Sequence, residues 1–109
     1  MDCGIAVNPD TITAQMQGSI VDGLSAALYG EITLKQGRVQ QSNLDSYHML
    51  RLSQAPKITV SIMEGADDPG GIGEPGVPPT APALVNAIFA ATGKRIRSLP
   101  VVKHGIHVA

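Results

Sequence analysis

Residues 8–30, NPDTITAQMQGSIVDGLSAALYG, carry the strongest helix pattern in this chain of 109 residues. Asn8 suits an N-cap, and Pro9 suits the first helical position because its missing amide hydrogen would be unpaired there in any case. Gly30 is expected to end the helix. Apolar side chains recur every four residues and so share one helical face: Ile12, Met16, Ile20, Leu24 and Leu28.

Two glycines interrupt this predicted helix, Gly18 and Gly23. Each costs about 1 kcal/mol relative to alanine, so we expect another backbone to pack very close to the helix at these positions. A second helix is predicted over residues 81–92, APALVNAIFAAT, with Thr80 as its cap and Gly93 at its end.

The remaining segments predict strands and loops around the two helices. A hairpin is expected around a Gln-Gly turn, and KITVSIME, with β-branched residues and alternating faces, is expected to be a central strand. The stretch GADDPGGIGEPGVPP has too many glycines and prolines for a regular element and predicts a loop. The predicted strands lie at residues 2–7, 31–35, 38–42, 57–64 and 96–102.

These elements give the order β-α-β-β-β-α-β in a single domain. The predicted fold class is α+β, with two main helices packed on one mixed β-sheet. A chain of 109 residues supports one domain at most, with a modest core.

Charge and cysteine content exclude several classes of function. Eight basic and nine acidic residues give a net charge of -1, which provides no electrostatic reason to expect nucleic acid or an anionic membrane as partner. Cys3 is the single cysteine, so no disulfide framework, zinc pair or iron–sulfur ligand set is expected. No apolar run approaches the length of a membrane span. The compartment, cytoplasmic or periplasmic, stays open.

Two polar side chains could carry chemistry. Glu74 lies between Gly73 and Pro75, where a stiff backbone ahead of a helix could hold a carboxylate in a cavity as a base. The amide of Gln15 could both donate to and accept from a cofactor. From spacing alone, both are more typical of solvated side chains. His104 and His107 lack a third ligand nearby, and no metal site is expected.

Two blocks of the sequence resemble the large subunits of molybdenum hydroxylases, the xanthine oxidase and aldehyde oxidoreductase family. Residues 70–101 are similar to the C-terminal signature of that family, with a Gly-Glu-Pro turn, an Asn-Ala-Ile helix and an Arg-x-Leu-Pro tail. Residues 7–31 resemble a second segment, with an Asn-Pro start and a Gly-Leu-x-x-Ala-Leu-Tyr continuation. The likeness is strongest to the bacterial isoquinoline 1-oxidoreductase beta subunit and aldehyde dehydrogenase type.

The resemblance implies that residues 1–109 are a C-terminal fragment of a molybdopterin-binding domain. It implies oxidative hydroxylation of an aldehyde or N-heterocycle with oxygen from water, a reaction for which this fragment alone would be inactive. Glu74 matches the catalytic glutamate of the family, Gln15 matches a glutamine that contacts the pterin, and Gly73 is expected at the cofactor and, with Pro75, to hold the base in place.

The same resemblance implies the cofactor and partners of the intact parent. The cofactor would be molybdenum-molybdopterin, in its cytosine dinucleotide form, with none bound to this fragment. The partners would be the remainder of the large subunit, an iron–sulfur small subunit and a small-molecule substrate. The N-terminus reads as mid-sequence in the family, which suggests a truncated piece, and exposed apolar surface could also drive formation of a homo-oligomer.

A second hypothesis belongs to another class. The chain could be a stand-alone, non-catalytic oligomerisation or binding module derived from the same fold. Its glycine-bearing elements would then form an interface between copies, and Glu74 would be an ordinary loop residue.

Overall fold

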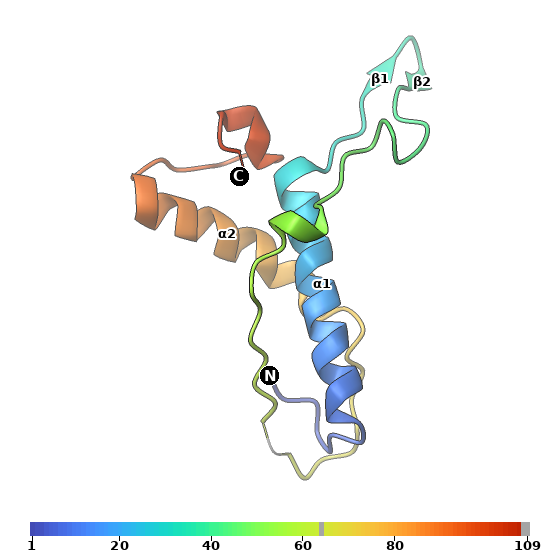
Figure 1. Ribbon diagram of the computed structural model, residues 1–109, viewed down its shortest axis with the longest axis vertical. Coiled ribbons are helices and arrows are strands. Elements are labelled where there is room, and N and C mark those ends of the chain that lie inside the picture. The colour runs from blue at the N-terminus through green and yellow to red at the C-terminus, as the bar shows by residue number, and fades with distance from the viewer. Residues whose placement is uncertain (64, 108–109) are drawn as a thin grey trace.

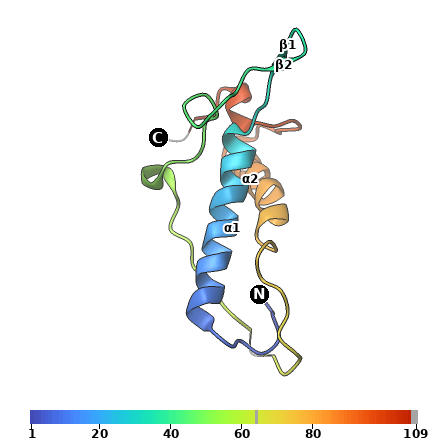
Figure 2. The same cartoon turned by 90° about the vertical axis from the view of Figure 1, so that its right-hand side faces the viewer.

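The computed structural model describes residues 1–63 and 65–107 and has an elongated form, with extents of 53 × 35 × 25 Å. Two helices cross near the middle of the molecule, and a small hairpin projects beyond one end of the longer helix (Figures 1 and 2). The elements in chain order are α1 (Pro9–Tyr29), β1 (Leu34–Lys35), β2 (Arg38–Val39), the 3-10 turn η1 (Leu52–Gln54), α2 (Val77–Thr92) and the 3-10 turn η2 (Val101–His104).

Helix α1 forms where the sequence predicts it. The Asn8 side chain accepts a hydrogen bond from the backbone amide of Thr11 at 3.1 Å, and Pro9 is the first helical residue. At the other end, the amide of Gly30 donates to the carbonyl of Ala26 at 3.0 Å. Both termini therefore have the local partners that stabilise helix ends.

The two helices meet at one of the two glycines in α1. An added Cβ at Gly23 would lie 2.8 Å from the Cβ of Thr80 and 3.1 Å from the carbonyl oxygen of Val77. The predicted close approach is therefore confirmed at Gly23. It is wrong at Gly18, where an added Cβ would have no neighbour within 4 Å.

Helix α2 begins at Val77, four residues earlier than predicted. Gly76 is its N-cap, and Thr80 is not a cap but lies in the helix with its hydroxyl donating to the carbonyl of Gly76 at 2.6 Å. Pro78 and Pro79 are tolerated in the first turn because amides there have no intrahelical acceptor. Gly93 ends the helix as predicted, in the left-handed conformation with φ of 70°.

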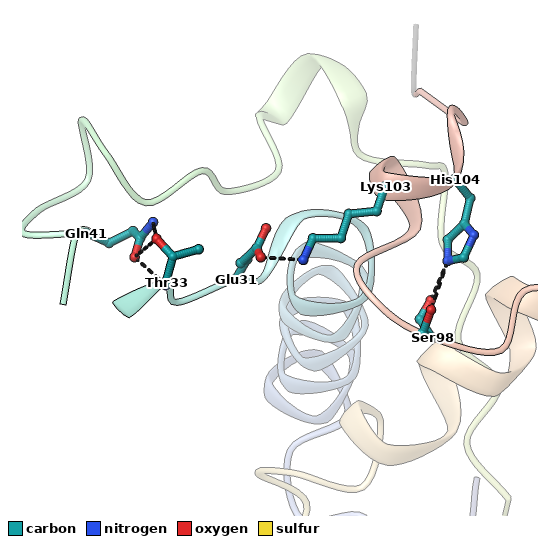
Figure 3. A network of polar contacts seen from close by, with 6 residues as sticks. All are labelled: Glu31, Thr33, Gln41, Ser98, Lys103 and His104. Carbon is teal, nitrogen blue, oxygen red and sulfur yellow. Dashed lines mark hydrogen bonds and ion pairs between the residues drawn. The ribbon is translucent and has the colours of Figure 1, made fainter. Parts of the chain in front are cut away.

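The small hydrophobic core lies at the C-terminal end of α1. It consists of Leu28, Ile96 and Val101, and the side chain of Val101 is fully buried. Half-buried apolar residues of both helices surround it, among them Leu24, Leu84 and Ile88. The turn η2 packs on the end of α1 at this core, and the Lys103 ammonium forms an ion pair with Glu31 just after α1 (Figure 3).

The α+β class rests on the two helices and one two-stranded antiparallel sheet. Leu34 pairs with Val39 and Lys35 pairs with Arg38. The turn between them has positive φ at Gln36 and Gly37, the geometry that matches the twist of a tight hairpin. The predicted hairpin is confirmed, although its strands are shorter than expected.

The predicted mixed sheet does not form within residues 1–63 and 65–107. Residues 57–63 are extended and run along α1 in both views (Figures 1 and 2), with Ile58, Val60 and Ile62 half-buried and the residues between them exposed. The alternation of faces is thus as predicted, but among the described residues this segment has backbone-to-backbone bonds only to Met1, and the Gln17 side chain donates to the Ile58 carbonyl. A strand requires a neighbour along its length to pair its backbone groups. Residue 64, at the end of this predicted strand, lies outside the described residues.

The two terminal strands of the predicted order are also absent. Residues 2–7 form no ladder, and the segment predicted to be the last strand is irregular up to the cis Leu99–Pro100 bond and then continues as η2. The first run has two isolated backbone bonds, from the amide of Ile5 to the carbonyl of Asp67 and from the amide of Gly70 to the carbonyl of Cys3, which do not make a regular ladder. Apolar runs alone could not identify these elements, because short runs occur in strands and in packed coil alike.

Candidate functional site

Glu74 lies in the turn that leads into α2. The side chain is exposed, and the carbonyl of Glu74 accepts a hydrogen bond from the amide of Val77 at 2.9 Å. Pro75 restricts the preceding residue to extended backbone conformations. The backbone of the turn is thus restricted both by its own hydrogen bond and by proline, which sets the point from which the Glu74 side chain extends.

The Glu74 carboxylate shares a hollow with a second carboxylate. Glu74, Asp22, Val77 and Pro78 line a hollow of about 260 Å³ between α1 and the start of α2. The sequence had not singled out Asp22. A signal was available, since Asp22 lies seven residues after Gln15, two turns along the same helical face.

Gln15 is exposed on α1, on the side where the Glu74 turn packs. Ser19, one turn after Gln15, is buried by this turn, because the Cβ position of Gly76 is 2.1 Å from the Ser19 hydroxyl oxygen. Ser19 and Asp22 thus separate Gln15 from Glu74. Gln15 therefore lies on α1 one turn before the residue that the Glu74 turn covers, and the hydrogen bonds among the described residues include none between Gln15 and Glu74.

Gly73 has no structural reason within this chain to be glycine. An added Cβ there would meet nothing within 4 Å, and its φ is not positive. Gly76 is the opposite case, because Ser19 leaves no room for a side chain there. Gly73 therefore presents open backbone directly beside Glu74, where another molecule could approach closely.

The chain matches a family model described as a molybdopterin cofactor-binding domain over residues 1–56, about half of its length. The chain belongs to this family. The match covers α1 and the hairpin, and so includes Gln15 and Asp22, whereas Glu74 lies beyond it.

Relatives of this molybdopterin cofactor-binding chain are similar over nearly all of it. It is 41% identical to the isoquinoline 1-oxidoreductase subunit beta of Brevundimonas diminuta and 37% identical to the membrane-bound aldehyde dehydrogenase (pyrroloquinoline-quinone) of Gluconacetobacter polyoxogenes, in both cases over 93% of the chain. It is 32% identical to the xanthine dehydrogenase molybdenum-binding subunit of Escherichia coli O157:H7, over 92% of the chain. The chain spans only 13% to 14% of the length of these relatives.

A solved structure shares the fold. The crystal structure of the Cu,Mo-CO dehydrogenase in its carbon monoxide reduced state superposes with a TM-score of 0.73 at 23% identity, over 84% of this chain and 12% of that one. The two helices and their connections therefore have a counterpart within a much larger protein of known structure.

This molybdopterin cofactor-binding chain exposes more surface than its size predicts. Its accessible area is 7610 Å², whereas a compact monomer of this mass exposes about 5,700 Å². The radius of gyration is 16.6 Å, against about 13 Å for a compact domain of this length. Large apolar side chains are part of this surface, including Val7, Leu34, Leu44 and Leu52.

The remaining candidates from the sequence are the histidines near the C-terminus and a possible metal cluster. No group of three or more potential metal ligands comes together within residues 1–63 and 65–107. His104 lies 2.9 Å through Nε2 from the carbonyl of Ser98 and 3.2 Å from its hydroxyl (Figure 3). A ring nitrogen that donates to a carbonyl cannot act as a base toward the hydroxyl. Among the helices described, none is long and apolar enough to cross a membrane.

Proposed function

We propose that this chain is the part of a molybdenum hydroxylase large subunit that supplies the catalytic base. In this proposal Glu74 is the base, Gln15 and Gly73 contact the cofactor, and the chain alone is inactive. The reaction is the oxidative hydroxylation of an aldehyde or an N-heterocycle with oxygen from water. The observation that carries the proposal is the exposed carboxylate of Glu74, held on a proline-restricted turn beside the helix of a molybdopterin cofactor-binding family member.

The geometry of the turn suits a general base. A base must keep its carboxylate accessible and in a fixed position relative to the proton that it removes. Glu74 is exposed, and the bond from Val77 to its carbonyl together with Pro75 limits the backbone. Asp22 lines the same hollow and brings a second carboxylate to it.

Gln15 and Gly73 fit the role of cofactor contacts on one side of a larger site. The Gln15 amide is exposed, so it is free to donate to and accept from a pterin ring without adding charge. Gly73 leaves its backbone open to close approach. The molybdenum cofactor, when bound, supplies the redox chemistry. The chain lacks a cluster of metal ligands within its described residues, so its residues would contact the cofactor while other parts of the subunit hold it.

The relatives suggest the substrate class and the partners. Names among them refer to isoquinoline, aldehyde and xanthine, and two of the names describe a subunit, one as subunit beta and one as a molybdenum-binding subunit. One name refers to pyrroloquinoline-quinone instead, so we base the cofactor on the family model. We propose the cytosine dinucleotide form of the cofactor, and as partners the rest of the large subunit and an iron–sulfur small subunit.

The experiment uses a complete relative as host. The matching region of the Brevundimonas diminuta subunit is replaced by this chain, and the chimera is produced with its partner subunit. Turnover of isoquinoline per bound molybdenum is compared between the chimera and its Glu74→Gln variant. A fall of about 100-fold or more at equal metal content is the expected result, since a positioned general base contributes 10²–10⁴-fold. Near-equal turnover would favour the non-catalytic module instead.

A further inference from the structure

An apolar groove lies between the two helices, next to the Glu74 turn. Its volume is about 440 Å³, and nearly all of its lining is apolar. Helix α1 contributes three residues of the stripe identified in the sequence, and α2 contributes the opposite wall: Met16, Ile20, Leu24, Ala83, Leu84 and Ala87. One end of the groove is formed by Pro75, directly after Glu74.

The groove exists because α1 and α2 touch at one point and separate on either side of it. They touch where Thr80 reaches Gly23, and this contact leaves Met16, Ile20 and Leu24 only half-buried. Ile12 and Leu28, at the two ends of the same stripe, are buried by other parts of the chain. The middle of the stripe is thus the part for which this chain provides no cover.

We propose that this groove holds an apolar segment from the remaining part of a molybdenum-binding large subunit, and that this segment packs against Pro75 and thereby fixes the Glu74 turn. The inference rests on the proposed function and names a structural partner for the same site. It assigns the groove to a segment of the larger subunit and not to a second copy of this chain.

Two quantities favour that occupant. The accessible surface of the whole chain, 7610 Å², exceeds that of a compact monomer of its mass by about 1,900 Å². This excess is more than twice the roughly 800 Å² that one partner buries in a standard interface. The chain spans only 13% of the isoquinoline 1-oxidoreductase subunit beta that it resembles, so relatives of this kind have ample further chain to cover it. A contact of this size is typical of obligate partners.

The position of the groove connects packing to catalysis. An occupant in contact with Pro75 would add a packing contact to the turn that carries Glu74, beside the backbone hydrogen bond that already joins this turn to α2. Catalytic groups must be held within a fraction of an ångström of their working position, which requires support from surrounding side chains. Covering the groove would also exclude water from one side of the base.

The test places an arginine in the groove of the same chimera. Ala83 and Ala87 are both exposed here and line the groove, so Ala83→Arg introduces a charge where the occupant would lie. Ala26→Arg is the matched control, because Ala26 is exposed on α1 and does not line the groove. Recovery of molybdenum-loaded chimera should fall at least about tenfold for Ala83→Arg and stay unchanged for Ala26→Arg.

The isolated chain controls for misfolding. Ala83→Arg in the 109-residue chain should leave the helical circular dichroism signal unchanged, since the side chain points into an open groove. If Ala83→Arg lowers the helical signal of the isolated chain, Ala87→Arg is used as the test variant in its place. Full recovery of loaded chimera with arginine in the groove would overturn the proposal. So would an isolated chain whose dimer is dissolved by the substitution while the chimera is unaffected, because the occupant would then be a second copy.

Failure of this inference is distinguishable from failure of the proposed function. Glu74→Gln should retain metal loading and lose turnover, whereas a groove variant should lose loading. A chimera that loads metal normally with arginine in the groove but loses turnover with Glu74→Gln would refute only the proposed occupant of the groove. A chimera that loses metal loading with arginine in the groove but turns over normally with Glu74→Gln would refute only the assignment of Glu74 as the catalytic base.

Discussion

Gly23 of α1 and Thr80 of α2 are in contact at a distance that only glycine allows, since an added Cβ at Gly23 would lie 2.8 Å from the Thr80 Cβ. This contact sets the crossing of the two helices. The crossing in turn places the Glu74 turn against Ser19 and opens the groove on the side of Pro75.

Substitution of Gly23 should therefore destabilise the fold. Gly23→Ala forces the Thr80 side chain or the helix backbone to move, at a cost of about 1–3 kcal/mol. Thermal unfolding followed by circular dichroism measures the change. The control is Gly18→Ala, which should stabilise α1 by up to about 1 kcal/mol because the new methyl group meets nothing. Equal effects at the two glycines would contradict the account of the crossing.

Thr80 should be sensitive to the loss of its hydroxyl. The hydroxyl is buried and donates to the Gly76 carbonyl at 2.6 Å. Thr80→Val keeps the shape of the side chain and leaves that carbonyl without this donor, so unfolding should become easier by about 1 kcal/mol. Denaturant titration measures it. Thr80→Ser, which keeps the hydroxyl and loses a methyl group, separates the hydrogen bond from packing against Gly23.

Val101 should be the most sensitive position of the core. It is the only fully buried large side chain among the described residues and packs with Leu28 and Ile96. Val101→Ala is expected to cost about 1–3 kcal/mol through lost burial and a residual cavity. Val102→Ala, at the half-buried neighbour, should cost less. A smaller effect at Val101 than at Val102 in the same unfolding assay would place the core elsewhere.

Local signals made both helices predictable from the sequence. The Asn8 and Pro9 start, the Gly30 and Gly93 ends and the four-residue spacing depend on residues close in the chain, and each matches the structure. The predicted start of α2 is wrong because Thr80 is a good cap residue in isolation, whereas here it lies inside the helix, with its hydroxyl bonded to the Gly76 carbonyl and its Cβ against Gly23.

Strand pairing could not be predicted in the same way. Residues 57–63 have the expected alternation, yet pairing depends on which segment lies alongside, and within the described residues only Met1 does so by backbone bonds. The candidate site shows the same difference between local signals, which the sequence displays, and long-range contacts, which it does not. Glu74 and Gln15 were proposed from their local motifs and the family resemblance, whereas Asp22 became a candidate only when the crossing of the helices brought it to the hollow of Glu74.

The most direct test of the central claim is a single-turnover measurement on the molybdenum-loaded chimera. Excess isoquinoline is mixed with oxidised enzyme, and the rate of cofactor reduction is followed for the parent chimera and for its Glu74→Gln variant. The account predicts that reduction slows by about 100-fold or more at unchanged metal content, with Asp22→Asn causing a smaller change. Reduction of the Glu74→Gln variant at the parent rate would contradict it.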